Sequence, residues 1–237
     1  RPWARATSRV PPRRIVRAAE GTRGDAQPLI ELGARLRAAG HDAVFCSSPD
    51  FAGQAASLRL PFVASGDSIR EFIVERAAVI DRSPFGALIE GVRIFRDRFE
   101  ARLEALLELA RGADLVIGAG AELAASVAAE ARGTAYRYVV YCPGMIPSRE
   151  HAPVFLPWQD LPGWLNRALW PAFLRPAVRV LRGAVAPARR RLGLAPYRDL
   201  YRMMLSDRPL LAVDASLGRA PADAPFPLDQ VAALHPT

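Results

Sequence analysis

An aspartate follows a glycine turn at a place where a carboxylate can do either of two jobs. The stretch EGTRGD, residues 20–25, comes directly after a short apolar run and directly before a helical pattern. Asp25 can act as the cap of that helix, because capping and the helix dipole both favour negative charge there. It can also act as a general base for a hydroxyl within hydrogen-bond reach. Spacing alone favours the cap but leaves both interpretations open.

The turn also has the glycines that a binding loop needs. Gly21 and Gly24 let the backbone approach a bound group and take positive φ where required. The turn follows the first predicted strand, and open α/β sheets bind ligands at the carboxyl ends of their strands. This turn is therefore the first candidate site.

Two common nucleotide-binding motifs are not supported by the sequence. The P-loop motif GxxxxGK[ST] is excluded because the chain contains no lysine. Residues 118–123, GAGAEL, follow a predicted strand and open a helix, as a dinucleotide fingerprint does. The third small position is occupied by Leu123, however, and no acidic residue follows about 20 residues later. A tight strand-to-helix turn is the preferred interpretation.

The overall composition indicates a folded chain with a strongly basic charge. Of the 237 residues, 51% are hydrophobic and 24% are charged, which is enough to build a core. The net charge is +8, and all 32 basic residues are arginines. Most of them are scattered and alternate with acidic residues, which favours solvated faces over a nucleic-acid-binding surface.

The cysteines and the apolar runs bear on location. Cys46 and Cys142 show neither metal-site spacing nor a disulfide framework, which suits a reducing, cytoplasmic interior. No run of about 18 apolar residues predicts a membrane-spanning helix.

Short apolar runs alternate with helical periods from residue 14 onward. Strands are predicted at 15–19, 41–46, 60–65, 113–120, 134–141 and 208–215. Helices are predicted at about 29–39, at 50–58 with Asp50 as cap, at 85–110 and at 121–132. Repeated strand–helix–strand units require parallel pairing with helical crossovers, so the expected fold class is α/β, with a Rossmann-like parallel sheet flanked by helices.

The remaining segments complete the expected domain organisation. Residues 142–163 are predicted to be irregular, and the helical stretches after them to be broken at Pro171, Pro176 and Pro187. Residues 1–13 are expected to be a flexible tail, residues 14–215 one domain, and residues 216–237 a loop or linker.

Several segments carry a resemblance to a known family. GTRGDAQPLIELGARLRAAGHDAVFCSSPDF, residues 21–51, with LRLPFVASG after it, resembles the amino-terminal signature of GT-B glycosyltransferases. The branch is the one that acts on sterols, lipids and antibiotic aglycones. Residues 113–153, 161–170 and 208–217 support the same resemblance, which covers about residues 14–237.

The resemblance implies one half of a GT-B fold, the Rossmann-like domain that binds the acceptor. Asp25 would take the proton from an acceptor hydroxyl as that oxygen attacks the anomeric carbon with inversion. Gly21, Thr22, Arg23 and Gly24 would lie beside the phosphates or the sugar of the donor. Helix N-termini and hydrogen-bond donors would stabilise the leaving diphosphate of a UDP- or dTDP-sugar, without an obligatory metal or a cofactor.

Two residues and the chain length depart from the family pattern. Arg17 stands inside the first strand, and Glu20 occupies a place where relatives carry small or apolar residues. Glu20 could raise the pKa of Asp25 or block the donor, or it could point to solvent. The family's donor-binding domain is missing, so residues 216–237 would lead toward a domain supplied in cis or by a separate chain.

An aromatic group is the candidate acceptor-binding wall. Arg149, His151, Phe155, Trp158 and Trp164 fall close together in the sequence, with Trp170 and Phe173 after them. They can form a wall of an acceptor pocket or an amphipathic surface resting peripherally on a membrane. Packing against the core or the missing domain is the alternative.

The sequence therefore predicts the acceptor-binding domain of an inverting glycosyltransferase. Its expected partners are a nucleotide sugar and a lipophilic hydroxylated acceptor, such as a sterol, a lipid, or a polyketide or peptide aglycone. The alternative is a non-catalytic acceptor-binding or partner module with the same fold.

Overall fold

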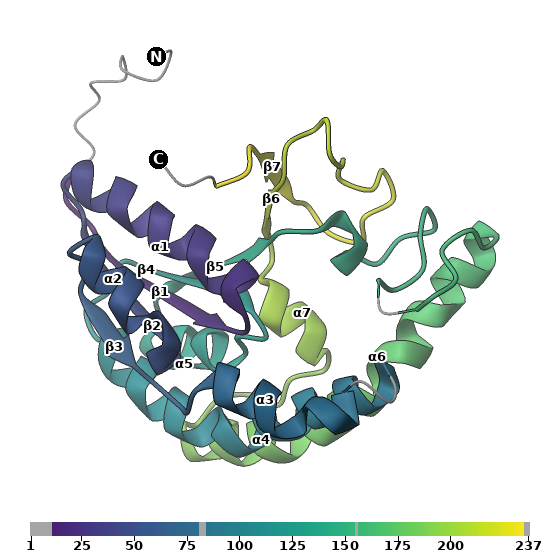
Figure 1. Ribbon diagram of the computed structural model, residues 1–237, viewed down its shortest axis with the longest axis horizontal. Coiled ribbons are helices and arrows are strands. Elements are labelled where there is room, and N and C mark those ends of the chain that lie inside the picture. The colour runs from purple at the N-terminus through teal and green to yellow at the C-terminus, as the bar shows by residue number, and fades with distance from the viewer. Residues whose placement is uncertain (1–10, 81–83, 155, 235–237) are drawn as a thin grey trace.

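One parallel sheet of seven strands organises the chain (Figure 1). The computed structural model describes residues 11–80, 84–154 and 156–234, except for the side chains of residues 79, 80 and 84–89. The strand order is β3-β2-β1-β4-β5-β6-β7. The strands are β1 (Arg14–Glu20), β2 (Asp42–Ser47), β3 (Phe62–Ala64), β4 (Leu115–Gly120), β5 (Ala135–Val140), β6 (Leu210–Ala212) and β7 (Asp229–Val231).

Helices cover both faces of the sheet, as the α/β prediction requires (Figure 1). The α-helices are α1 (Arg23–Ala38), α2 (Ala52–Ser57), α3 (Ile69–Ile80), α4 (Pro84–Leu109), α5 (Ala124–Arg132), α6 (Gly163–Arg191) and α7 (Leu200–Leu205). Side chains of α1 and α2 pack on one face of the sheet, and side chains of α4, α5 and α6 pack on the other. The prediction of a Rossmann-like sheet is confirmed.

The alternation of side chains along β1 decides where its two charged residues lie. Ile15 and Ala19 point into the core under α1, whereas Val16 and Ala18 point into the core under α4 and α5. By the same period of two, Arg17 points toward α1 and Glu20 toward α4. Both side chains are buried.

The sheet has a topological switch point between β1 and β4. The chain adds β2 and β3 on one side of β1 and then returns to add β4, β5, β6 and β7 on the other side. The connections after β1 and β4 therefore leave the sheet in opposite directions, and a crevice opens between them at the carboxyl edge. Asp25 follows β1, so the fold brings it to this crevice.

The prediction that prolines break the helical stretches after residue 163 is wrong. α6 runs without interruption through Pro171, Pro176 and Pro187. All three prolines lie on the exposed side of the helix. Water can therefore satisfy the carbonyl groups that lose their partners, and the buried side of the helix still packs.

Two further predictions require correction. The short helix at 50–58 begins as a 3-10 turn (Pro49–Phe51) capped by Ser48, and the Asp50 carboxylate instead accepts hydrogen bonds from the backbone of Ile69 and Arg70, so it caps α3. The helix α3 itself is not among the predicted elements. Part of residues 216–237 is not irregular, because β7 pairs in parallel with β6. Residues 1–10 lie outside the described residues.

Candidate active site

The carboxylate of Asp25 belongs to the first turn of α1. Its Oδ2 atom accepts a hydrogen bond from the Thr22 backbone N–H at 2.9 Å, and the Asp25 backbone N–H donates to the Thr22 carbonyl at 3.0 Å. The bond from the Thr22 N–H to the Asp25 side chain is one half of a capping box, so Asp25 does act as a cap. Burial nevertheless raises the pKa of Asp25, although the bonds from Thr22 oppose this. The carboxylate is therefore a stronger base than a solvated helix cap.

Two glycines make room for this carboxylate, one directly after β1 and one at the end of β4. A Cβ atom on Gly21, whose φ is +151°, would lie 2.2 Å from Asp25 Oδ2. A Cβ atom on Gly120, whose φ is +70°, would lie 3.0 Å from Asp25 Cγ and 2.3 Å from the Glu20 carbonyl oxygen. Any other residue at either position would displace the acid. The glycine turns after β1 and β4 thus enclose Asp25 from two sides.

Asp25 lines a cavity of about 700 Å³ at the switch point. Its floor comes from the ends of β1, β4 and β5, and its walls from α4, α6 and α7. The apolar lining residues include Val92, Phe95, Leu123, Met145, Trp170, Phe173, Leu174, Ala177, Val178, Leu181, Leu200, Met204 and Leu205. This volume and this lining suit a large apolar ligand.

The tyrosines of the cavity are tied to the backbone. Tyr138 donates its hydroxyl hydrogen to the Gly120 carbonyl, Tyr141 to the Asp25 carbonyl at 3.3 Å, and Tyr201 to the Met145 carbonyl. Burial raises the pKa of all three phenols, so they remain protonated donors. Among the described lining residues, the ionisable carboxylates are those of Asp25 and Glu20.

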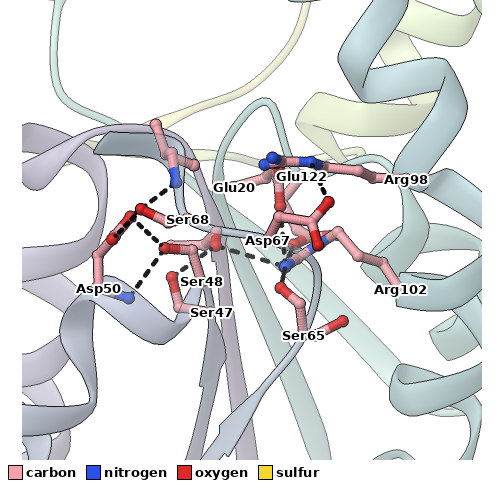
Figure 2. Close-up of polar contacts among 12 residues, drawn as sticks. Glu20, Ser47, Ser48, Asp50, Ser65, Asp67, Ser68, Arg98, Arg102 and Glu122 are labelled. Atoms are coloured by element: carbon pink, nitrogen blue, oxygen red, sulfur yellow. Dashed lines mark hydrogen bonds and ion pairs between the residues drawn. The ribbon is translucent and has the colours of Figure 1, made fainter. Parts of the chain in front are cut away.

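Glu20 is held in a buried ion-pair cluster beside the cavity (Figure 2). Its Oε2 atom lies 2.8 Å from Arg102 Nη1, and its Oε1 atom lies 3.8 Å from Arg98 Nη1. Arg102 also pairs with Glu122 and donates to the carbonyls of Ala19 and Ser65. Burial raises the pKa of Glu20, and the charge of Arg102 opposes this. Glu20 therefore does not point to solvent, and its carboxylate is engaged with two guanidinium groups.

Similarity to known proteins agrees with this geometry. No protein-family model matches the chain. In Amycolatopsis orientalis, glycosyltransferase GtfE is 31% identical and vancomycin aglycone glucosyltransferase 30% identical, each over 210 residues. These alignments cover 86% of this chain but 50% and 49% of the relatives. The chain spans about half the length of the curated relatives it matches.

Solved structures agree on the fold. CalG4, the calicheamicin glycosyltransferase, superposes with a TM-score of 0.59 at 16% identity, over 89% of this chain and 50% of that one. VinC in complex with dTDP gives 0.54 at 16% identity, over 88% and 51%. The chain is a homologue of GT-B glycosyltransferases and has the fold of one GT-B half. The resemblance seen in the sequence is confirmed.

The predicted donor-side residues divide into two groups. Gly21 and Thr22 line the cavity together with Asp25. Arg23 and Gly24 are exposed in the first turn of α1 and do not line it. The Arg23 Nε atom instead donates to Gln27 Oε1 at 2.8 Å, one turn further along the helix.

Four of the five predicted acceptor-binding residues lie outside the cavity lining. His151 makes a T-shaped contact with Trp170, with ring centroids 5.9 Å apart, and the backbone N–H of Arg149 donates to Asp223 at 2.9 Å. Trp158 and Trp164 are 64% and 72% exposed. Phe155 lies outside the described residues. A role in acceptor binding stays a prediction for these five.

The cavity takes most of its apolar walls from residues whose types and spacing carry no functional signal in the sequence. Tyr138 and Tyr141 come from the end of β5, and Leu174 and Ala177 from the middle of α6. Trp170 and Phe173 carried the only signal, as aromatics of the predicted helical stretch. The other wall residues are of types that are common in protein cores. They line a cavity only because α6 packs beside the switch point of the sheet.

Proposed function

We propose that this chain is the acceptor-binding domain of an inverting glycosyltransferase. It binds a lipophilic alcohol, and Asp25 removes the hydroxyl proton as the oxygen attacks the anomeric carbon of a dTDP- or UDP-sugar. The bond from that carbon to the diphosphate breaks, and the diphosphate leaves with the electron pair. The names of the relatives support the class of acceptor, because one acts on the vancomycin aglycone.

One observation carries the proposal. The cavity of about 700 Å³ is mostly apolar and has two carboxylates among its described lining residues. One of these, that of Glu20, is paired with Arg102 and Arg98. Asp25 is then the acid available to a ligand hydroxyl. Because burial raises its pKa, Asp25 is a stronger base for that hydroxyl than a solvated aspartate.

The proposal includes a second, donor-binding half. The relatives are about twice as long as the aligned region, and VinC was solved with dTDP. In this scheme residues 14–215 bind the acceptor, and a donor domain reaches the same crevice in cis or as a separate chain. The diphosphate would then lie near Gly21 and Thr22, at the N-terminus of α1.

The test is the substitution Asp25→Asn in the protein that contains both halves. Asparagine keeps a side-chain oxygen for the Thr22 N–H, so the helix cap survives while the base is lost. We expect kcat to fall by about 10²–10⁴-fold, with acceptor affinity changed little. Asp114→Asn is the matched control, because Asp114 also accepts a backbone N–H, from Arg14 at 2.8 Å, and lies before β4 at the opposite edge of the sheet.

The result also separates the two candidate functions. Near-normal transfer by Asp25→Asn would leave Asp25 as a helix cap only. Tight binding of a hydrophobic alcohol, with no transfer from any nucleotide sugar in the two-domain protein, would favour the non-catalytic binding module.

A further inference from the structure

The positive charge of this chain is concentrated in one helix. α6 contains seven arginines and no acidic residue, and the net charge of the whole chain is +8. The remainder of the chain is therefore nearly neutral. Arginines that look scattered in the sequence are gathered because α6 continues through its three prolines.

Five of these arginines form a stripe along the exposed side of α6. At 100° per residue they fall within a sector of about 140°. They are Arg167, Arg175, Arg179, Arg182 and Arg190. None of the five has an ion-pair partner among the residues that the structure describes, whereas Arg189 and Arg191 pair with glutamates. We call these five residues the arginine stripe.

Two exposed tryptophans lie at the start of the stripe. Trp164 falls within the same sector of α6, and Trp158 belongs to the loop that leads into the helix. Tryptophan is enriched at membrane–water interfaces, because its ring is apolar and its N–H group can hydrogen-bond to water. Figure 1 shows the N-terminal end of α6 projecting at the rim of the molecule.

Another side of α6 lines the apolar cavity. Trp170, Phe173, Leu174, Ala177 and Leu181 line it from outside the sector of the arginine stripe, and Val178 lines it from the edge of that sector. One helix thus has a cationic outer side and an apolar inner side that leads to Asp25. None of the described helices has the length and apolar character needed to cross a membrane.

We propose that the arginine stripe docks this domain on an anionic lipid bilayer, with Trp164 in the interface. A lipophilic acceptor can then pass from the bilayer along α6 into the cavity, a step that rests on the proposed function. Each arginine near an anionic surface strengthens binding roughly fivefold, so the five together suffice for reversible binding.

Vesicle co-sedimentation tests the docking without any activity readout. The chain is mixed with vesicles of phosphatidylcholine alone or of phosphatidylcholine with phosphatidylglycerol. We expect binding only to the anionic vesicles, a blue shift of tryptophan emission that is lost in Trp164→Ala, and release by high salt. The triple variant R175S/R179S/R182S should bind on the order of 100-fold more weakly.

A matched control variant tests whether vesicle binding depends on the arginine stripe in particular. R37S/R70S/R111S removes the same charge from exposed arginines of other elements and should weaken binding less than about tenfold. Equal losses in the two triple variants, or no binding to anionic vesicles, would overturn the proposal. Equally tight binding to duplex DNA, with no effect of Trp164→Ala, would show a general polyanion surface instead. Loss of transfer in Asp25→Asn with vesicle binding intact would separate the two proposals.

Discussion

The Nη1 atom of Arg102 lies 2.8 Å from the Oε2 atom of Glu20, and this buried ion pair joins the middle of α4 to the last residue of β1. The next residue, Gly21, opens the turn whose Thr22 N–H holds the Asp25 carboxylate. The Glu20 carbonyl also accepts the N–H of Ala121, after β4. The side chain and the backbone of Glu20 therefore fix the turn from two directions.

Breaking this pair should unfold the domain more readily. Arg102→Met leaves Glu20 and Glu122 buried without their common partner, and such losses cost about 3–5 kcal/mol. The free energy of unfolding in urea measures the effect. Arg96→Met, which removes an exposed pair with Asp97 on the same helix, should leave it almost unchanged. A loss below 1 kcal/mol for Arg102→Met would mean that the cluster contributes little.

Gly120→Ala should impair transfer through the position of Asp25. The new Cβ would lie 3.0 Å from Asp25 Cγ and 2.3 Å from the Glu20 carbonyl, so the acid must move. We expect kcat in the two-domain protein to fall by roughly 100-fold, the size of effect that a misplaced catalytic group produces. Gly112→Ala has the same φ of +70° and meets no atom within 4 Å, so it controls for backbone strain. Equal kinetic losses in both variants would rule out displacement of the acid.

Arg17→Leu should stabilise the domain. The Arg17 guanidinium is fully buried under α1 and donates to the Leu29 carbonyl, but Nε and Nη2 have no partner among the described residues. Burial lowers the pKa of Arg17 to about 10, which reflects the cost of the buried charge. Replacing buried charged groups with apolar ones gains about 1–4 kcal/mol in favourable cases. Thermal and urea unfolding would detect a gain, and a clear loss would contradict this account.

Gly33 provides an internal check of that account. A Cβ atom on Gly33 would lie 1.7 Å from Arg17 Nη1, and a fully buried arginine cannot move away. Gly33→Ala should therefore destabilise the natural chain by about 1–3 kcal/mol. In the Arg17→Leu background the same change should be neutral or stabilising, because alanine is the better helix former. Additive effects in the double variant would contradict the contact.

The protonation of Asp25 should make both stability and transfer depend on pH in a definite direction. Its folded-state pKa is raised by burial, so its contribution to stability is present below the unfolded pKa and is lost as the pH rises through the folded value. Transfer should decline as the pH falls through that same folded value, since the base must be ionised. Carboxyl carbon NMR of the isolated chain should show Asp25 titrating above an ordinary aspartate. Asp114 should titrate below it, because the Arg14 N–H and Arg13 lower its pKa.

Filling the cavity should block the acceptor selectively. Ala177→Trp places an indole in the cavity from α6, whereas Ala172→Trp places one on the exposed side of the same helix. Titration with a hydrophobic alcohol should give a Kd at least tenfold higher for Ala177→Trp and unchanged for Ala172→Trp. Unchanged binding in both would place the acceptor site elsewhere.

Local patterns predicted most of the fold. The runs that became β1, β2, β4 and β5 alternate with helical periods, and their order alone requires a parallel sheet. The helix α3 was not predicted, although Ser68 and Glu71 have the spacing of a capping box. The strand β7 has three residues and no local signal, so only its pairing with β6 defines it.

Only the part of the site that directly follows the first strand could be predicted from the sequence. Asp25 and its glycine turn carry a motif, but Gly120 lies 95 residues further along and reads only as a tight turn. The cavity walls depend on the long, unbroken course of α6. That helix is unbroken because its three prolines are exposed, and spacing in the sequence does not predict their exposure. Trp158 and Trp164 attracted attention by type, yet tertiary packing left them outside the cavity.

The acid and the walls of the cavity belong to different parts of the chain. The acid is held by turns of the two central strands, whereas the walls come largely from helices that follow residue 160 and from α4. Exchanging α6 and α7 between homologous proteins would thus alter which alcohols are accommodated, while the turns that hold Asp25 keep their shape. Directed libraries for new acceptors are therefore best confined to those two helices.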